Sequence, residues 1–212
     1  ETCTVTCRFQ EHLQMMDVIQ NPDFFCEFTD VPFKKTENSY EHYREQLRAH
    51  VLKPLSEKFG IDTSDEALMR TIEEHNEVCR LINEMGEYRK LDNPTITGYE
   101  FHVIQLVTLV CPKYLILPYL RETAQELRTR EPDAKPWFRC KVMLSGSEND
   151  DPGFTKLIEG CGAMVVADRY CYGSMPGREE IVVEEGQEPL DAIARHYLKT
   201  GMCPRFMGQD EM

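Results

Sequence analysis

Apolar residues recur at helical spacing through the first part of the chain. The spacing predicts a helix over residues 4–20, which Asn21–Pro22 ends. A short apolar run over residues 24–28 predicts a strand. A longer helix should then run to Phe59 and Gly60, bent or split at Pro54, because proline cannot donate the helical hydrogen bond.

Two capping boxes predict where the next helices begin. In each, a threonine should cap the helix and a glutamate three residues later should reach back to it, first at Thr63 and Glu66 and then at Thr97 and Glu100. The second box opens a strongly apolar helix, and one more helix follows it. Residues 34–131 are therefore expected to be almost wholly helical.

The pattern changes after the proline-rich stretch that ends at Pro136. Residues 140–144 and 163–167 are two apolar runs, and the second is continuous, which is typical of a parallel strand buried on both faces. Asp151–Pro152 starts a helix between them. Strand, helix and strand together predict a βαβ unit with parallel strands. A last helix is expected over residues 189–198.

Charge and length exclude some classes of protein. The 212 residues carry a net charge of −13, which argues against binding to a nucleic-acid backbone. No apolar run approaches the ~18 residues of a membrane span. Glu1 opens the chain without an initiator Met or a secretory leader, so we expect a processed chain or a fragment that lies in the cytoplasm.

Nine cysteines are present, and none forms a Cys-x-x-Cys pair, which excludes zinc ribbons and thioredoxin motifs. Five are expected to be small buried hydrophobes, namely Cys26, Cys79, Cys111, Cys140 and Cys161. Cys3 and Cys7 lie one turn apart at a predicted helix start, where the helix dipole favours the thiolate that binds iron. The residues alone leave open whether this pair is a ligand or incidental.

Ligands of parallel α/β sheets gather where the strands end. Three such ends are predicted, at Thr29–Asp30, at Ser145–Gly146–Ser147 and at Tyr170–Ser174. Small residues there let a backbone approach a ligand, although a Ser-Gly-Ser turn alone is more typical of an ordinary turn. The chain contains no phosphate-binding glycine motif, no His-Glu-x-x-His and no Gly-x-Ser-x-Gly. The residues by themselves thus establish an α/β domain with a helical insertion.

Several of these segments together resemble the 2-hydroxyacyl-CoA dehydratase and benzoyl-CoA reductase family. The resemblance covers nearly the whole chain, in family order. The segments that carry it are Asp30–Lys34, Thr63–Lys90, Ile96–Gly98, Lys141–Pro152, Leu157–Asp168, Cys171–Ser174 and Pro189–Leu198.

The resemblance implies two flavodoxin-like α/β domains joined by a mostly helical segment. Residues 1–33 would end the first domain, residues 34–136 would form the helical segment, and residues 137–212 would start the second domain. The chain would then be a fragment of a two-domain subunit of about twice its length. The strands at 140–144 and 163–167 should lie in a different sheet from the strand at 24–28.

The resemblance also implies an oxygen-sensitive 4Fe–4S cluster held by three cysteines per subunit. Cys3 matches the middle ligand, and the other two would lie outside this chain, so the chain alone should be inactive. Thr4 stands where the family usually has Asp, and Tyr172 and Met175 stand where it has Thr and Arg. These departures bear on the substrate class.

The implied activity is that of an acyl-CoA dehydratase (a lyase) or an aromatic acyl-CoA reductase. An ATP-dependent activator protein would pass one electron to the cluster, and a second homologous subunit would complete the enzyme. Substrate contacts are expected at Ser145, Gly146, Cys171 and Ser174, and Lys34, Lys35 and Arg169 are candidate cations for CoA phosphates. The alternative is a non-catalytic electron-transfer or assembly subunit of the same fold.

Overall fold

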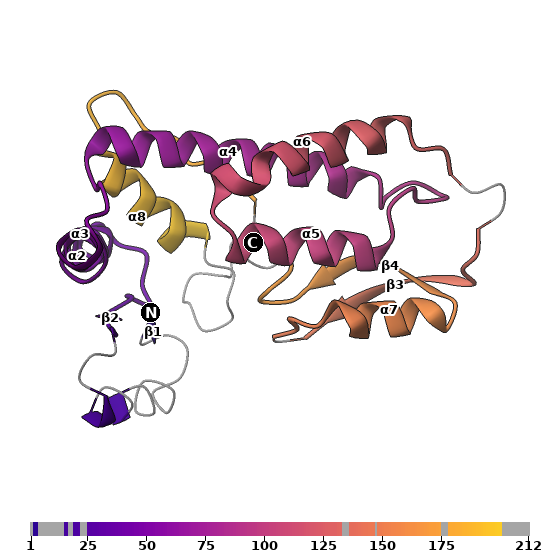
Figure 1. Cartoon of the computed structure of the whole chain (residues 1–212), viewed down its shortest axis with the longest axis horizontal. Coiled ribbons are helices and arrows are strands. Elements are labelled where there is room, and N and C mark those ends of the chain that lie inside the picture. The colour runs from indigo at the N-terminus through magenta and orange to yellow at the C-terminus, as the bar shows by residue number, and fades with distance from the viewer. Residues whose placement is uncertain are drawn as a thin grey trace. The chain divides into compact units, whose positions relative to one another are not determined.

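The structure of the chain is a computed structural model (Figure 1). It describes residues 2–3, 15–16, 19–21, 25–132, 136–146, 148–174 and 178–200. Most of the helix predicted over residues 4–20 lies outside these ranges, although residues 15–16 and 19–20 are helical. Among the described helices, none has both the length and the apolar character needed to cross a membrane.

The chain divides into two compact units, which are treated separately below. Unit 1 comprises residues Glu1–Arg70 and Ile181–Met212, and unit 2 comprises Thr71–Glu180. The three-part division expected from the family resemblance stays a prediction. Each unit holds a small parallel sheet with two described strands.

In unit 1, strand β1 (Thr2–Cys3) pairs in parallel with β2 (Phe28–Thr29). The strand predicted over residues 24–28 is thus shorter and later than expected, because ladder pairing with β1 begins only at Phe28. Among the described strands, β2 pairs with β1 and β3 pairs with β4, as the sequence analysis anticipated.

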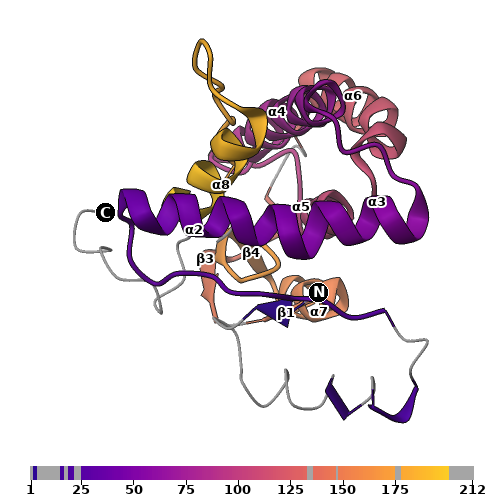
Figure 2. The ribbon, with the colours of Figure 1, turned by 90° about the vertical axis from the view of Figure 1, so that its left-hand side faces the viewer.

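One long helical segment follows in unit 1, and it changes its winding before Pro54. It consists of α2 (Glu37–Leu47), the π-helical turn η1 (Arg48–Leu52) and α3 (Lys53–Phe59), with Gly60 at φ 66° closing it (Figure 2). Pro54 lies in the first turn of α3. The predicted interruption is therefore confirmed, and it takes the form of a wider turn that accommodates the missing N–H without ending the helix.

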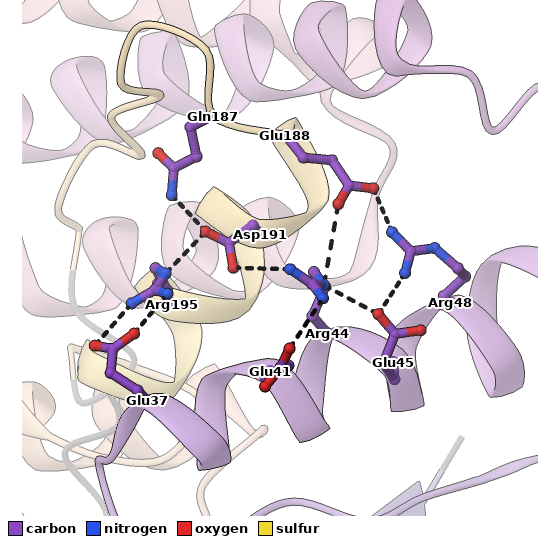
Figure 3. A network of polar contacts seen from close by, with 9 residues as sticks. All are labelled: Glu37, Glu41, Arg44, Glu45, Arg48, Gln187, Glu188, Asp191 and Arg195. Carbon is purple, nitrogen blue, oxygen red and sulfur yellow. Dashed lines mark hydrogen bonds and ion pairs between the residues drawn. The ribbon is translucent and has the colours of Figure 1, made fainter.

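Helix α8 (Pro189–Thr200) contacts α2 through a network of ion pairs (Figure 3). Arg195 of α8 joins two carboxylates, with Nη2 2.8 Å from Glu37 Oε2 and Nε 2.8 Å from Asp191 Oδ2. Asp191 also accepts a hydrogen bond from Gln187 Nε2 at 2.7 Å. A second arginine, Arg44 of α2, lies 3.6 Å from Asp191 Oδ1. The network joins two segments that lie far apart in the sequence.

Unit 2 is built on three helices, α4 (Asp65–Glu87, which begins in unit 1), α5 (Gly98–Val110) and α6 (Lys113–Thr129). The capping box at Thr97 and Glu100 is confirmed, because the Glu100 amide donates to Thr97 Oγ1 at 3.0 Å and Glu100 Oε2 accepts from the Thr97 amide at 2.8 Å. The box at Thr63 is wrong. Helix α4 begins one residue later than it requires, and Ser64 Oγ accepts from the Ala67 amide instead.

Helices α4 and α6 run in the same direction and share an apolar core. Glu77 pairs with Arg121 and Glu84 with Arg128, each through two hydrogen bonds of 2.5–2.8 Å. From the first pair to the second, the residue number rises by seven on both helices, so the helices are parallel. Heptad-spaced residues form the core between these helices, namely Val78, Ile82 and Met85 of α4 and Leu117, Leu120, Ala124 and Leu127 of α6. This spacing places the apolar residues of each helix on one face, where the two helices share the core.

The predicted βαβ unit is confirmed in unit 2. Strand β3 (Cys140–Ser145), helix α7 (Pro152–Gly160) and strand β4 (Ala163–Arg169) follow in order, and the two strands are parallel. Asp151 caps α7 by accepting from the Gly153 amide at 2.8 Å. Helices α5 and α7 contact each other and β4 (Figure 1).

Burial of the cysteines follows this layout and differs from expectation at two positions. Cys79 is buried, and Cys26 and Cys111 are half-buried, but Cys140 and Cys161 are exposed. Among the described residues, β3 pairs only with β4, and Cys161 follows the last turn of α7 at the surface. The prediction that both are buried is therefore wrong.

Candidate functional site

The carboxyl ends of β3 and β4 lie side by side. Ser145 is in register with Arg169, and the Gly146 amide approaches the Arg169 carbonyl at 3.5 Å. Ser145 and Gly146 are exposed there. The turn after β4 carries Cys171 and Ser174, both half-buried. The two predicted ligand-binding ends in unit 2 thus meet at one edge of the sheet, whereas Thr29 and Asp30 belong to unit 1.

Asp168, near the end of β4, fixes this turn. Its Oδ1 accepts a hydrogen bond from the Ser174 amide at 2.8 Å, and its Oδ2 accepts one from the Ser174 hydroxyl at 2.9 Å. Gly173 lies against the same carboxylate, so closely that a Cβ there would be 2.2 Å from Asp168 Oδ1. A glycine is therefore required at this position for the turn to close on the strand.

Two side chains from the helical part of unit 2 reach the same carboxylate. Gln105 of α5 donates from Nε2 to Ser174 Oγ at 2.8 Å and to Asp168 Oδ2 at 3.3 Å. Arg89, two residues after α4, donates from Nη1 to Asp168 Oδ2 at 3.2 Å. We call Arg89, Gln105, Asp168 and Ser174 the Asp168 cluster. Each comes from a different part of the chain, and the cluster thus ties the helices to the sheet edge.

The ion pair in the Asp168 cluster is shielded from water. The side chains of Arg89 and Asp168 are 11% and 6% exposed, and the Arg89 guanidinium lies 3.6 Å from the centre of the Phe101 ring. Burial by itself raises the pKa of Asp168, but the hydrogen bonds from Ser174 and the charge of Arg89 outweigh it, so that pKa lies below its ordinary value. Burial lowers the pKa of Arg89, and Asp168 opposes this. Both groups remain charged near neutral pH.

A buried glutamate holds the start of α5 against the βαβ unit. Glu159 of α7 accepts hydrogen bonds from the amides of Gly98 and Tyr99 at 2.8 and 3.1 Å and from the Val165 amide at 3.2 Å. Gly98 is so close to β4 that a Cβ would lie 2.5 Å from the Val165 side chain. A carboxylate at a helix N-terminus satisfies amides that the helix itself cannot. This contact places Gln105, two turns further along α5, beside Asp168.

His102 adds a second tie between α5 and α7. Its Nε2 donates to the Asn149 carbonyl oxygen at 3.0 Å, because that oxygen can only accept, and its Nδ1 lies 2.9 Å from the Thr155 hydroxyl. The ring also stacks on Tyr170, the first residue after β4, with 5.9 Å between ring centres. His102 thus packs α5 against α7 and the end of β4.

An open pocket of about 230 Å³ adjoins the Asp168 cluster. Ser174, Gln105, Arg89 and Phe101 line it, as do Ile82, Asn83 and Gly86 of α4. Lys90, Arg178 and Glu87 complete the lining. Arg178 follows the turn after β4, and its backbone carbonyl accepts from Asn83 Nδ2 at 2.9 Å. We refer to this space as the α4–β4 pocket.

The predicted site residues are distributed unevenly around this pocket. Of the four expected substrate contacts, Ser174 alone is among its described lining residues. Lys34 and Lys35 belong to unit 1, where Lys35 Nζ donates to the Lys199 carbonyl at 2.8 Å. Arg169 is exposed beside Ser145. The substrate-binding role of these residues stays a prediction.

Cys3 lies in β1, but its side chain and the whole of Cys7 lie outside the described residues. Within the described residues, no three His, Cys, Asp or Glu side chains are close enough together to hold a metal ion. The structure therefore leaves the cluster prediction for Cys3 untested.

Sequence reasoning missed Arg89, Gln105 and Arg178 as members of one site. The available signal was Gln105, a polar residue in a helix whose neighbours are almost all apolar. Such a residue must find a partner when it is buried, and this one is 2% exposed. Which partner it finds depends on contacts across 63 and 69 positions of the chain, and no local pattern indicates them.

The fold and this sheet edge define a mixed helix–strand protein with a polar site where its parallel strands end. The chain matches the family of the 2-hydroxyglutaryl-CoA dehydratase D-component over residues 1–212. It therefore belongs to that family and is a component of a 2-hydroxyacyl-CoA dehydratase-type enzyme. A search among curated proteins found no match.

Proposed function

We propose that this protein is a subunit of an iron–sulfur, radical-type acyl-CoA enzyme, a 2-hydroxyacyl-CoA dehydratase or a benzoyl-CoA reductase. In this proposal an ATP-dependent activator supplies an electron, and a second homologous subunit and an acyl-CoA thioester complete the system. The observation that supports it best is the family match over the whole chain. The flavodoxin-like, two-domain architecture is part of the same proposal.

Cys3 is the residue that we propose as a ligand of a 4Fe–4S cluster. A thiolate is the donor that such clusters use, and a cluster bound here would supply single electrons to an acyl-CoA thioester. The structure describes only the backbone of Cys3, paired in register with Thr29. Since no complete ligand set lies within the described residues, the steps below involve protein groups alone.

The protein's own contribution lies at the carboxyl edge of β3 and β4. Ser145 and Gly146 present an exposed backbone, and the turn with Cys171 and Ser174 is held to one conformation by Asp168. A preorganised turn of small residues can orient a substrate closely without moving. We therefore propose that these four residues contact the acyl-CoA and hold it in place.

The test uses the full-length subunit together with its partner subunit and activator, purified without oxygen. We expect activator- and ATP-dependent turnover of a 2-hydroxyacyl-CoA or an aromatic acyl-CoA, and about four irons and four sulfides per cluster-bearing chain. Cys3→Ala should lose iron and turnover together. Cys161→Ala, which removes an exposed cysteine elsewhere, should keep both, and the 212-residue chain alone should be inactive.

The outcomes separate the alternatives. Iron retained in full by Cys3→Ala would contradict the ligand assignment. A cluster that forms while no acyl-CoA binds or reacts would contradict the catalytic proposal and support an electron-transfer or assembly subunit. Cys171→Ser should retain its iron, because the family resemblance gives Cys171 no place among the cluster ligands.

A further inference from the structure

The α4–β4 pocket combines positive charge with polar side chains in a protein that is otherwise strongly acidic. Arg89, Lys90 and Arg178 line it, and Glu87 is the one acidic residue among its described lining residues. The chain as a whole carries a net charge of −13. Because most of the protein is negatively charged, a local excess of cations in the pocket attracts an anion there rather than to other parts of the surface.

The nearby carboxylates do not cancel this charge. Glu87 pairs with Lys90 at 2.5 Å, but both side chains are more than half exposed, so water screens the pair. Asp168 pairs with Arg89 at 3.2 Å and is saturated by donors from Ser174 and Gln105. Arg178 Nη2 donates to the uncharged Gly173 carbonyl at 3.4 Å. Of the described residues that line the pocket, three are thus cations and one is a carboxylate.

Compensation of a helix dipole explains part of this arrangement. Arg89 and Lys90 follow the C-terminal end of α4, where cations are favourable in any protein. It does not explain Arg178, which comes from the segment after β4 and is placed at the pocket by the Asn83 bond to its carbonyl. Nor does it explain why Ser174, Gln105 and Asn83 add hydrogen-bonding side chains to the same walls.

The size of the pocket restricts its ligand. Its volume of about 230 Å³ is below the ~300–1,000 Å³ that encloses a drug-sized molecule. One tetrahedral oxyanion fits this space, whereas a whole nucleotide would extend beyond it into solvent. Arginine and lysine are the side chains that bind phosphate oxygens most strongly.

We propose that the α4–β4 pocket binds a phosphate group, with Arg178 and Lys90 as its charged contacts and Ser174, Gln105 and Asn83 as polar walls. Arg89 provides fixed positive charge from behind, held by Asp168. The phosphate is either free in solution or an ester group of the nucleotide part of CoA. The second source rests on the proposed function, because it assumes an acyl-CoA substrate.

The experiment measures binding to the full-length protein by titration calorimetry at low salt. The probes are inorganic phosphate, adenosine 3′,5′-bisphosphate, adenosine, CoA and dephospho-CoA. We expect binding of the phosphorylated probes and none of adenosine. Arg178→Gln should weaken it by about 10- to 100-fold, the effect of losing a charged hydrogen bond. Lys156→Gln removes an exposed cation of α7 outside the pocket and should change affinity less than about twofold.

A further pair of variants protects the test against loss of folding. Lys90→Gln should weaken phosphate binding without lowering the melting temperature, because its side chain is 71% exposed. Arg178→Lys should recover part of the affinity lost in Arg178→Gln. Equal weakening by Lys156→Gln, or unchanged affinity in both Arg178→Gln and Lys90→Gln, would overturn the proposal, as would failure of every phosphorylated probe to bind at millimolar concentration.

The comparison of probes identifies the source of the phosphate. Preference for CoA over dephospho-CoA supports the 3′-phosphate of CoA, and equal affinity for inorganic phosphate and the bisphosphate supports free phosphate. The anaerobic iron and turnover assay is independent of these titrations. Phosphate binding without turnover would support the pocket assignment and contradict the proposed function. Turnover together with unaltered phosphate binding in the variants would support the proposed function and contradict the pocket assignment.

Discussion

In unit 1, helices α2 and α8 meet across exposed ion pairs, whereas in unit 2, helices α4 and α6 meet across a buried apolar face. Both pairs join distant parts of the sequence. No residue of α2 is buried, yet its charged side chains make several contacts with α8. Ten buried residues instead form the core of unit 2.

The two contacts differ in what they contribute, because a buried apolar face mainly stabilises the fold, whereas a network of ion pairs mainly determines which helices meet. Burying one large apolar side chain contributes about 1.5–3 kcal/mol, whereas an exposed ion pair contributes about 0–1 kcal/mol. Charged pairs must match in sign and position, however, and so they restrict which surfaces can meet. We therefore expect the core to supply most of the stability of unit 2, and the network to select the partner of α2 in unit 1.

The largest effect should come from the core. Leu127→Ala removes a side chain that is 1% exposed and should lower the free energy of unfolding by about 2–5 kcal/mol, because it leaves a cavity. Leu115→Ala, on the same helix but 53% exposed, should change it by less than about 0.5 kcal/mol. Urea unfolding followed by circular dichroism measures both. Equal costs would contradict the assignment of the α4–α6 face as the core.

A close backbone contact should give the next largest effect. Gly98→Ala places a Cβ 2.5 Å from both the Val165 side chain and its carbonyl, so α5 must move away from β4, at about 1–3 kcal/mol. Gly160→Ala, in α7 with no atom within 4 Å of the new Cβ, is the control and should be neutral or slightly stabilising. Thermal melting of the two variants decides the matter. A neutral Gly98→Ala would show that α5 does not need this contact.

Loss of the central carboxylate in unit 1 should cost less than either. Asp191→Asn removes a charge shared by Arg195 and Arg44 and should destabilise by about 1–2 kcal/mol, because its side chain is only 13% exposed. Glu41→Gln, 71% exposed and 4.0 Å from Arg44, should have almost no effect. Chemical unfolding of the pair at low salt tests this. A cost for Asp191→Asn as large as that for Leu127→Ala would remove the contrast between the units.

The smallest effect should appear in the dependence on pH and salt. Burial raises the pKa values of Asp168 and Asp191, but hydrogen bonds and neighbouring arginines outweigh it, so both lie below their ordinary value. A lowered pKa in the folded state means that each carboxylate stabilises the protein above the unfolded pKa of about 3.9. This stability is lost as pH falls through the lower, folded pKa. Both should therefore contribute fully at pH 5 and progressively less below about pH 4.

Salt distinguishes the two carboxylates. At about 1 M NaCl the Debye length is ~3 Å. The network around Asp191 includes Arg195 and Glu37, which are 38% and 77% exposed, and is therefore screened, whereas the Asp168 pair is screened much less. Unfolding measured from pH 5 to pH 2 should thus show a salt-sensitive part that disappears in Asp191→Asn and a salt-resistant part that disappears in Asp168→Asn. An acid transition that is equally salt-sensitive in both variants would contradict this assignment.

The sequence predicts the elements of the fold well where the signals are local. The βαβ unit follows from two apolar runs and Asp151–Pro152, and the start of α5 follows from Thr97 and Glu100, because each signal lies within a few residues of its effect. The box at Thr63 failed because Ser64 beside it can cap a helix equally well. Local chemistry alone does not choose between two adjacent hydroxyls.

The site was less predictable than the elements. Periodicity indicates which strand ends could bind a ligand, and the structure brings Ser145, Gly146, Cys171 and Ser174 to one edge. The periodicity of the sequence does not indicate which helix will cover that edge. Arg89 and Gln105 arrive there because Glu159 and Gly98 fix α5 against β4, and this contact spans more than 60 residues.

The ion pairs between the parallel helices α4 and α6 do not by themselves fix how the two helices are aligned. Because its two arginine–glutamate pairs repeat every seven residues, a slip by one heptad would still match Glu84 with Arg121. Such a slip needs about 10 Å of travel. The two residues between α5 and α6 are already extended, with ψ 146° at Cys111 and ψ 134° at Pro112, so this link cannot lengthen enough to allow it. The start of α5 is held against β4, and the end of α4 is held through Arg89 to Asp168. The contacts of both helices with the sheet therefore select one alignment of α4 with α6.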